Sequence, residues 1–238
     1  PWCGSPRSLR HCASQWGKPL AETEDACMWH LLTDKLAMVD PEDALPGRNT
    51  PVLEQPCYHR IFGDRLDAEL PGTDQIHLAM GCFWGAEKLY WQLEGVRLTQ
   101  VGYAGGYTPN PTYEEVCSGR TGHAEAVQVI FDPEQISLGE LLKVFFENHD
   151  PTQGPRQGND IGTQYRSAIW GSTPEQVDLA RAMLERLRPR FIDKGFGEIT
   201  TEVGLLTSFY PAEIEHQQYL DRVPHGYCPV HATGVSCG

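Results

Sequence analysis

Several features are missing from this sequence of 238 residues. It contains no apolar run of the ~18 residues that a membrane-spanning helix needs, so we expect no membrane insertion. It contains no Cys-x-x-Cys motif, which argues against a zinc ribbon and against a thioredoxin-type redox motif. Internal repeats and low-complexity segments are also missing, so we expect one sizeable core rather than a repeat array.

Basic residues are scarce relative to acidic ones. Lys and Arg together number 19, Asp and Glu number 32, and the formal net charge is −13. A chain this acidic, without a basic run, is a poor candidate for binding nucleic acid or an anionic membrane. We interpret the charge as a solubility feature.

Cysteines are present but sparse. The eight are Cys3, Cys12, Cys27, Cys57, Cys82, Cys117, Cys228 and Cys237. Their even number would suit a secreted disulfide framework, but the chain is long for one and its cysteines are far apart. A reducing compartment, which we expect to be the cytoplasm, with one catalytic cysteine relay fits better.

We expect four segments along the chain. Residues 1–27 are basic before Glu22 and lack an apolar signal core, so we expect a disordered extension ahead of a start at Met28; a transit peptide remains the alternative. Residues 28–74, punctuated by proline, are expected to form an N-terminal arm. Residues 75–223 are the expected catalytic core, and residues 224–238 a flexible tail that carries two cysteines.

Hydrophobic periodicity predicts the elements of the core. We expect strands at 76–80, 98–103, 124–131, 164–170 and 199–205, a helix after Cys82 that stops near Gly95, and helices at 138–149, 174–187 and 213–220, with a short helix at 28–32 and Gly-rich loops at 105–121 and 154–162. Ser137 and Glu140 have capping-box spacing, and Pro174 suits a first helical position. This order predicts an α+β, two-layer sandwich with a mixed sheet and a ferredoxin-like core.

The stretch Gly81-Cys82-Phe83-Trp84-Gly85 joins the first strand to the first helix. Unpaired N–H groups at a helix start favour negative charge, so we expect the pKa of the Cys82 thiol to be lowered. The two aromatic residues beside it suit a small apolar group on a substrate. A buried structural cysteine at a strand–helix junction is the competing interpretation, with about equal weight from position alone.

Glu125 is the second unusual residue. It falls on the same strand face as Val127, Val129 and Phe131, which are apolar. A carboxyl on a core-facing side is rare in proteins. An apolar environment disfavours the carboxylate, so we expect a raised pKa and a residue able to donate a proton.

The stretch around Cys82 resembles the signature of the A-type peptide methionine sulfoxide reductases. The resemblance continues in the family's order through Gly102-Tyr103-Ala104-Gly105-Gly106-Tyr107, Pro111-Thr112-Tyr113, Gly122-His123-Ala124-Glu125, Glu147-Asn148-His149-Asp150-Pro151, Gly158-Asn159-Asp160, Gly162-Thr163-Gln164-Tyr165-Arg166-Ser167, His216-Gln217-Gln218-Tyr219 and Gly226-Tyr227-Cys228. It runs from about Asp40 to the C-terminus, and it makes a purely structural role for Cys82 improbable.

The resemblance implies an enzyme that reduces methionine-S-sulfoxide, free or in proteins, to methionine. Cys82 would be the nucleophile and would become a sulfenic acid. Glu125 would supply the proton, and Tyr113 and Tyr165 would hold the sulfoxide oxygen. Asp160 matches another active-site position of the family, and we expect it to orient the polar network.

Further roles are implied for the aromatic pair and the tail. Phe83 and Trp84 would form the pocket for the terminal methyl group of the substrate. Cys228 matches the resolving cysteine of the family, and Cys237 resembles a second recycling cysteine that some members have. Their spacing reaches about 30 Å when extended, which permits transfer between sites.

The implied partners are oxidised proteins and free methionine sulfoxide as substrates and thioredoxin as reductant. We expect a monomer that needs no organic cofactor and no metal. Two alternatives remain at this stage. One is a methionine-binding adaptor on the same scaffold, which would need neither Cys82 nor Glu125. The other is a zinc deaminase, because His123-x-Glu125 matches half of that signature, although the Pro-Cys-x-x-Cys half is missing.

Overall fold

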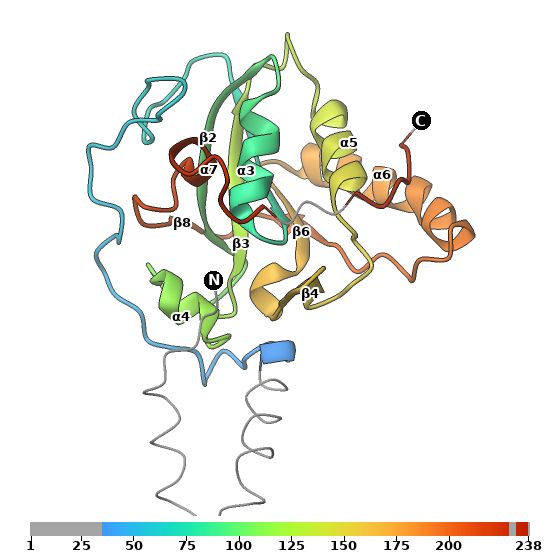
Figure 1. The fold of residues 1–238 in the computed structure, drawn as a ribbon, viewed down its shortest axis with the longest axis horizontal. Coiled ribbons are helices and arrows are strands. Elements are labelled where there is room, and N and C mark those ends of the chain that lie inside the picture. The colour runs from blue at the N-terminus through green and yellow to red at the C-terminus, as the bar shows by residue number, and fades with distance from the viewer. Residues whose placement is uncertain (1–34, 229–231, 238) are drawn as a thin grey trace, which may run out of the picture.

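A mixed β-sheet forms the frame of the molecule (Figure 1). The computed structural model describes residues 35–228 and 232–237, and in these residues one six-stranded sheet has the order β7-β6-β1-β3-β2-β8. Its strands are β1 (Asp74–Met80), β2 (Val96–Ala104), β3 (Ala124–Phe131), β6 (Ser167–Gly171), β7 (Glu202–Leu205) and β8 (Phe209–Pro211). Neighbours pair antiparallel except β6 and β7, which are parallel. The α+β class and the mixed sheet are confirmed.

Helices follow the strands, and their starts have clear causes in the sequence. They are α3 (Phe83–Trp91), α4 (Tyr113–Cys117), α5 (Leu138–Asn148), α6 (Pro174–Asp193) and α7 (Tyr219–Arg222), with a 3-10 turn at Thr163–Tyr165. The predicted capping box is present, since the Ser137 side chain accepts from Glu140 N. Pro174 opens α6 after the cap residue Thr173, as expected.

The main core lies between the sheet and its helices. On β3, Val127, Val129 and Phe131 face this side, and each is at most 1% exposed. The alternate residues Ala124 and Ala126 belong to a smaller apolar cluster that also contains Trp170 of β6. Fully burying one large apolar side chain stabilises a fold by about 1.5–3 kcal/mol. The alternation on β3 is therefore enough to determine which side of the strand meets the helices.

Several sequence-based boundaries were wrong. The region 105–121 is not all loop, because Thr112 and Glu115 form a capping box that starts α4. The region 154–162 contains the hairpin β4 (Arg156–Gln157) and β5 (Asp160–Ile161). The helix expected at 213–220 is reduced to α7, because Gln218 adopts a left-handed φ of 46°. The strand β8 was missed.

Other elements differ only at their ends. The helix after Cys82 ends at Trp91, before Gly95, whose φ is 92°. The strand expected from Gln164 begins at Ser167, and the one expected from Ile199 begins at Glu202. The predictions for 1–27 and for a helix at 28–32 lie outside the described residues.

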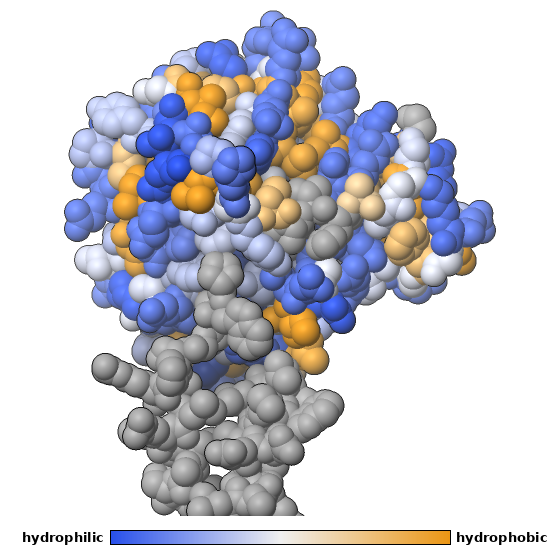
Figure 2. All heavy atoms as spheres, viewed as in Figure 1, coloured by the Kyte–Doolittle hydropathy of each residue, from blue (hydrophilic) through white to orange (hydrophobic). Residues whose placement is uncertain are grey.

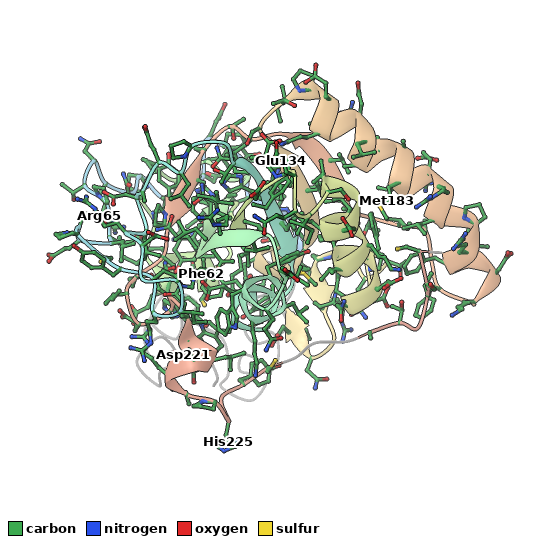
Figure 3. The ribbon with its side chains drawn as sticks, turned by 90° about the horizontal axis from the view of Figure 1, so that it is seen from above. Phe62, Arg65, Glu134, Met183, Asp221 and His225 are labelled. Atoms are coloured by element: carbon green, nitrogen blue, oxygen red, sulfur yellow. The ribbon has the colours of Figure 1, made fainter. Side chains whose placement is uncertain are left out.

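Residues 35–73, which we call the N-terminal segment, run along the α4 and β8 side of the molecule (Figure 1). Leu53 and Leu66 are buried, and Phe62 packs against the main core. Because Leu53 and Leu66 are buried, the segment contributes to the core. Viewed from above, Phe62 and Arg65 lie on the opposite side of the molecule from Met183 of α6 (Figure 3).

Seen from the same side as in Figure 1, the surface is mainly hydrophilic, with apolar residues in small groups (Figure 2). Among the helices of the described residues, none combines the length and apolar character needed to cross a membrane.

A buried polar network joins the N-terminal segment to α3 and α7. The fully buried carboxyl of Glu87 accepts hydrogen bonds from the backbone N–H and the side-chain amide of Gln218 (2.9 and 2.7 Å) and from the Thr99 hydroxyl (3.1 Å). Nε2 of His59 contacts the same hydroxyl at 2.9 Å, while its Nδ1 accepts from backbone N–H groups. His59 Nε2 therefore donates, and burial lowers the pKa of His59 to about 4.

This network predicts a pH-dependent stability term. Burial raises the pKa of Glu87 from 4.5 to about 7, so the folded state favours the protonated carboxyl. Its stabilising contribution is complete below pH 4.5 and is lost as pH rises towards 7. Between pH 4.5 and 7, the wild type should therefore lose stability relative to Glu87→Gln, which has no carboxyl to titrate. In urea titrations, the difference in unfolding free energy (variant minus wild type) should increase by about 1.4 kcal/mol per pH unit. Parallel pH curves for the two proteins would contradict this.

Candidate active site

Cys82 lies at the junction between β1 and α3. Gly81 has a φ of 89°, and a Cβ at that position would lie 2.7 Å from Gln157, so the turn requires glycine. Cys82 is the N-cap residue, and α3 begins at Phe83. The backbone N–H groups of Trp84 and Gly85 hydrogen-bond to its thiol, which is 8% exposed at the residue level. The predicted strand–turn–helix geometry is confirmed.

The expectation of a lowered pKa for this thiol was wrong. Burial raises the pKa of Cys82 well above its usual value, and the nearby Glu125 carboxyl raises it further. The two N–H groups at the helix start act in the opposite direction but are weaker. Sequence reasoning identified the helix start but not the depth of burial. Burial and the Glu125 carboxyl thus both favour the thiol of Cys82 over its thiolate.

Glu125 reaches the same helix start from the sheet. It lies on β3 and is 1% exposed. Its Oε2 accepts a hydrogen bond from Phe83 N–H at 3.0 Å. This bond joins β3 to the first residue of α3 and holds the carboxyl beside the cysteine. The two chemically unusual residues of the sequence are thus neighbours in space.

A pocket of about 450 Å³ opens beside the Cys82 thiol. Its lining is Lys35, Cys82, Trp84, Tyr113, Asn159, Asp160, Ile161, Gln164, Tyr165 and Tyr227. Five of the predicted site residues are among these ten, although they come from four different parts of the chain. Phe83 is not part of the lining. It is 1% exposed and packs among Trp84, Tyr103 and Tyr113, so it supports the wall from behind.

The apolar wall of the pocket is an aromatic cluster. The Trp84 ring stacks on Tyr219 at 4.2 Å and on His216 at 5.8 Å between centroids, and Tyr113 lies 4.4 Å from His216. Trp84 Nε1 donates to Nδ1 of His216 at 3.3 Å. Burial lowers the pKa of His216, which is consistent with a neutral ring that accepts this bond. The indole plane is thus held by contacts on more than one side.

Two phenols and one carboxyl form the polar side. Burial, and then the charge of Glu125, raises the pKa of Tyr165, so its hydroxyl keeps its proton. The Tyr227 hydroxyl donates to Asp160 Oδ1 at 2.9 Å, and burial together with this bond raises the pKa of Tyr227 to about 12. The residue before Cys228 is therefore anchored at the pocket. The pocket therefore places hydroxyl donors and an apolar wall on two sides of the Cys82 sulfur.

The two tail cysteines have different environments. Cys228 is exposed, whereas Cys237 is only 3% exposed. Cys237 N–H donates to Glu147 of α5 at 2.8 Å, and Arg190 of α6 donates to Ser236 O at 2.8 Å. Burial and the Glu147 charge raise the pKa of Cys237 to about 11. Val235 and Cys237 therefore insert into the apolar core beside α5 and α6.

Sequence reasoning missed several residues of this site. Asn159, Gln164 and Tyr227 lie inside motifs that were recognised, but nothing in their local pattern indicated a pocket. His216 and Tyr219 lie in the motif His216-Gln217-Gln218-Tyr219, whose spacing looked helical. Only the fold shows that His216 and Tyr219 pack against Trp84.

The zinc alternative is not supported by the geometry of His123. Its Nδ1 accepts from Gly106 N–H at 3.1 Å, and its Nε2 lies 2.7 Å from Thr108 O, to which it donates. Both ring nitrogens are therefore engaged in holding the 105–108 loop. Within the described ranges, no group of three or more His, Cys, Asp or Glu side chains has metal-binding geometry.

Comparison with known proteins identifies the relatives of this chain. Residues 74–236 match the family model described as peptide methionine sulfoxide reductase. A peptide methionine sulfoxide reductase MsrA from Corynebacterium kroppenstedtii is 55% identical over 207 residues, which cover 84% of this chain and 94% of the relative. The mitochondrial peptide methionine sulfoxide reductase of Bos taurus is also 55% identical, over 84% of this chain and 86% of its own length.

Solved structures agree. Methionine sulfoxide reductase A of Corynebacterium diphtheriae superimposes with a TM-score of 0.78 at 50% identity, covering 85% of this chain and 98% of that one. The reduced form of Mxr1 from Saccharomyces cerevisiae gives 0.65 at 35% identity, covering 70% and 95%. The expected resemblance is confirmed, and the adaptor and deaminase alternatives are not supported. The chain belongs to the peptide methionine sulfoxide reductase family and is an oxidoreductase that reduces methionine sulfoxide to methionine.

Proposed function

We propose that Cys82 is the nucleophile of this reduction and that Glu125 handles the proton. The observation that carries the proposal is their shared position at the start of α3, where Glu125 accepts from Phe83 N–H beside the Cys82 thiol. A thiolate and a carboxylate so close together would repel each other, so the pair favours keeping one proton. That proton is available to the substrate.

The chemical step balances as an oxygen transfer. The sulfoxide oxygen takes a proton through Glu125, and the Cys82 sulfur supplies an electron pair to the substrate sulfur. The sulfur–oxygen bond of the substrate breaks and its oxygen becomes bonded to the Cys82 sulfur. Methionine leaves with the electron pair on its sulfur, and Cys82 is left oxidised as a sulfenic acid. The thiol proton is retained in the S–OH group, so no other reactant is needed in this half-reaction.

Binding roles follow from the two sides of the pocket. Trp84 contacts the terminal methyl group, supported by Phe83 behind it. Tyr113 and Tyr165, as neutral phenols, donate to the sulfoxide oxygen, and donors aimed at developing charge are the main electrostatic aid to such reactions. Asp160 orients Tyr227 by the 2.9 Å hydrogen bond. The family resemblance implies the S epimer, free or in proteins, as substrate.

Recycling uses the tail. Cys228 attacks the sulfenic acid, releases water and forms a disulfide with Cys82. Cys237 then attacks Cys228 by thiol exchange and moves the disulfide outward to a dithiol reductant, for which thioredoxin is the candidate implied by the family. Because Cys237 is buried against α5 and α6, it must leave that position before it can react.

Other properties remain proposals. We propose a reducing compartment such as the cytoplasm, in keeping with the few, widely spaced cysteines of the sequence. We propose a monomer. We also propose that β1, α3, β2, β3, α5 and β6 form a ferredoxin-like core, which the neighbour order β6-β1-β3-β2 supports.

Cys82→Ser should abolish reduction even in a single turnover, because a hydroxyl is a far weaker nucleophile than a thiol. The measurement is methionine released from methionine-S-sulfoxide after mixing with excess protein. Cys57→Ser is the matched control, since this thiol bonds to Glu54 O outside the pocket and its loss should leave the rate unchanged. Wild-type methionine release by the Cys82 variant would remove it from the mechanism.

Glu125→Gln should slow the single-turnover rate at neutral pH by roughly 10²–10⁴-fold, the usual contribution of general acid–base catalysis. The amide oxygen can still accept from Phe83 N–H, so the helix start keeps its position while the proton donor is lost. Thermal unfolding checks that the fold is intact. If a folded variant reacts at the wild-type rate, the proton comes from the tyrosines or from water.

Variants of the two tail cysteines should differ in which reductant supports their turnover. Cys228→Ser should complete the first turnover, accumulate sulfenic acid on Cys82 and stop with thioredoxin. Cys237→Ser should trap a Cys82–Cys228 disulfide and recycle slowly with thioredoxin but normally with a small dithiol, because only the protein reductant is too large to reach the pocket. Disulfide mapping by mass spectrometry distinguishes these states. Normal thioredoxin turnover by Cys237→Ser would end the relay at Cys228.

A further inference from the structure

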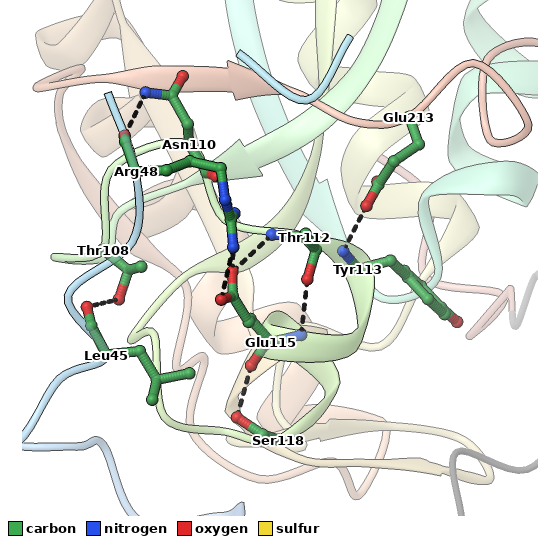
Figure 4. A network of polar contacts seen from close by, with 9 residues as sticks. All are labelled: Leu45, Arg48, Thr108, Asn110, Thr112, Tyr113, Glu115, Ser118 and Glu213. Carbon is green, nitrogen blue, oxygen red and sulfur yellow. Dashed lines mark hydrogen bonds and ion pairs between the residues drawn. The ribbon is translucent and has the colours of Figure 1, made fainter. Parts of the chain in front are cut away.

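Arg48 of the N-terminal segment is bonded to the loop that carries Tyr113 (Figure 4). Its guanidinium contacts both carboxylate oxygens of Glu115, at 2.9 and 2.7 Å, and donates to Asn110 O at 2.5 Å. In return, the side-chain amide of Asn110 donates to Arg48 O at 2.8 Å. Bidentate pairing fixes orientation as well as distance. Arg48 therefore holds α4 at a defined angle to the rest of the molecule.

The same carboxylate completes the start of α4. Glu115 Oε2 accepts from Thr112 N–H at 2.9 Å, while Glu115 N–H donates to the Thr112 hydroxyl at 3.3 Å. Helix α4 has five residues, which is too short to be stable without outside contacts. Its orientation therefore depends on these bonds. Tyr113 is the first helical residue, immediately after the cap.

Tyr113 is also held from the opposite side. Its backbone N–H donates to Glu213 Oε1 at 2.8 Å, and the other oxygen of that carboxylate accepts from the Tyr103 hydroxyl at 2.9 Å. Figure 4 shows Glu213 and Arg48 approaching this short stretch from different parts of the chain. The Tyr113 side chain then lines the pocket with Cys82.

The Arg48–Glu115 pair is not well placed to add much stability. The two side chains are 33% and 26% exposed, and partly exposed ion pairs stabilise proteins only weakly. Its effect should therefore appear in the position of α4 more than in the unfolding temperature. Geometry at a reacting centre is far more sensitive, because a displacement of about 1 Å can cost 10²-fold in rate.

We propose that Arg48 and Glu115 are positioning residues for the reductase. Together they orient α4 so that the Tyr113 hydroxyl meets the sulfoxide oxygen bound next to Cys82. The N-terminal segment, which has no recognisable chemical motif, is then part of the active site. This inference rests on the proposed function, in which Tyr113 donates to the substrate oxygen.

The test begins with two variants that remove the pair in different ways. Arg48→Met removes the guanidinium, and Glu115→Gln removes the charge but keeps an oxygen that can accept from Thr112 N–H. Each should lower the single-turnover rate on methionine-S-sulfoxide about tenfold, with an unfolding temperature near that of the wild type. Arg65→Met is the matched control, because it breaks the bidentate Arg65–Asp67 pair of the same segment and should leave the rate unchanged.

A double-mutant cycle decides whether Arg48 acts through Tyr113. Tyr113→Phe removes only the hydroxyl and should itself slow the reaction. In that background, Arg48→Met should cost less than twofold, because the group that it positions is already gone. An equal tenfold loss in both backgrounds would overturn the inference. So would wild-type rates for both folded pair variants.

The cycle also separates this inference from the function beneath it. If Tyr113→Phe reacts at the wild-type rate, the proposed role of Tyr113 fails, and the positioning role fails with it. If Tyr113→Phe is slow while Arg48→Met and Glu115→Gln are normal, the role of Tyr113 stands and only the positioning role is lost.

Discussion

The hydrogen bond between Phe83 N–H and the Glu125 carboxyl connects the two halves of the site. It links the first residue of α3 to the central strand β3 at 3.0 Å, and both residues are 1% exposed. A buried carboxyl without a donor would be costly, and a buried helix start without an acceptor would be costly too. Each satisfies the other, and the arrangement leaves the Cys82 thiol at the edge of the core with the Glu125 carboxyl at its side.

This arrangement changes the usual view of a reactive cysteine. A helix start is expected to favour a thiolate, but burial and Glu125 keep this thiol protonated. A thiol that is activated only together with its substrate is protected from unspecific oxidation, because the thiolate is the reactive form. The same logic applies to Cys237, whose pKa burial raises to about 11 while it packs against α5 and α6. In the proposed mechanism, both thiols change environment during a catalytic cycle.

Around the thiol, the aromatic wall and the polar side are held by separate parts of the chain. Trp84 contacts His216 and Tyr219, which follow β8, while Tyr113 N–H bonds to Glu213 and Arg48 pairs with Glu115 on the same short helix. The left-handed φ of Gln218 lets the chain turn so that its amide reaches Glu87 while Tyr219 reaches Trp84. The short helices α4 and α7 are therefore products of tertiary contacts rather than of helix propensity.

Much of the fold could be predicted from the sequence, because period-2 and period-3.6 patterns report directly on which residues face a core. The strand at 124–131 and the helix starts at Ser137 and Thr173 were predicted correctly for this reason. The pairing of Cys82 with Glu125 was expected only from the family resemblance. The Thr112–Glu115 capping-box spacing that starts α4 is present in the sequence but was not recognised. Local patterns could not supply β8 or the shortened α7, since these elements depend on Gly102 and Gln218 making contacts far along the chain.

The sequence alone determined the candidate reactive groups, a cysteine at a helix start and a carboxyl on an apolar strand face, and the motifs that identify the family. Only the tertiary structure decided the protonation of Cys82, the position of Phe83 behind the pocket wall, the burial of Cys237 and the part of the N-terminal segment that meets α4. The physical reason is that residue type and spacing specify local geometry, whereas the exposure and electrostatic surroundings of a group depend on which distant segments cover it.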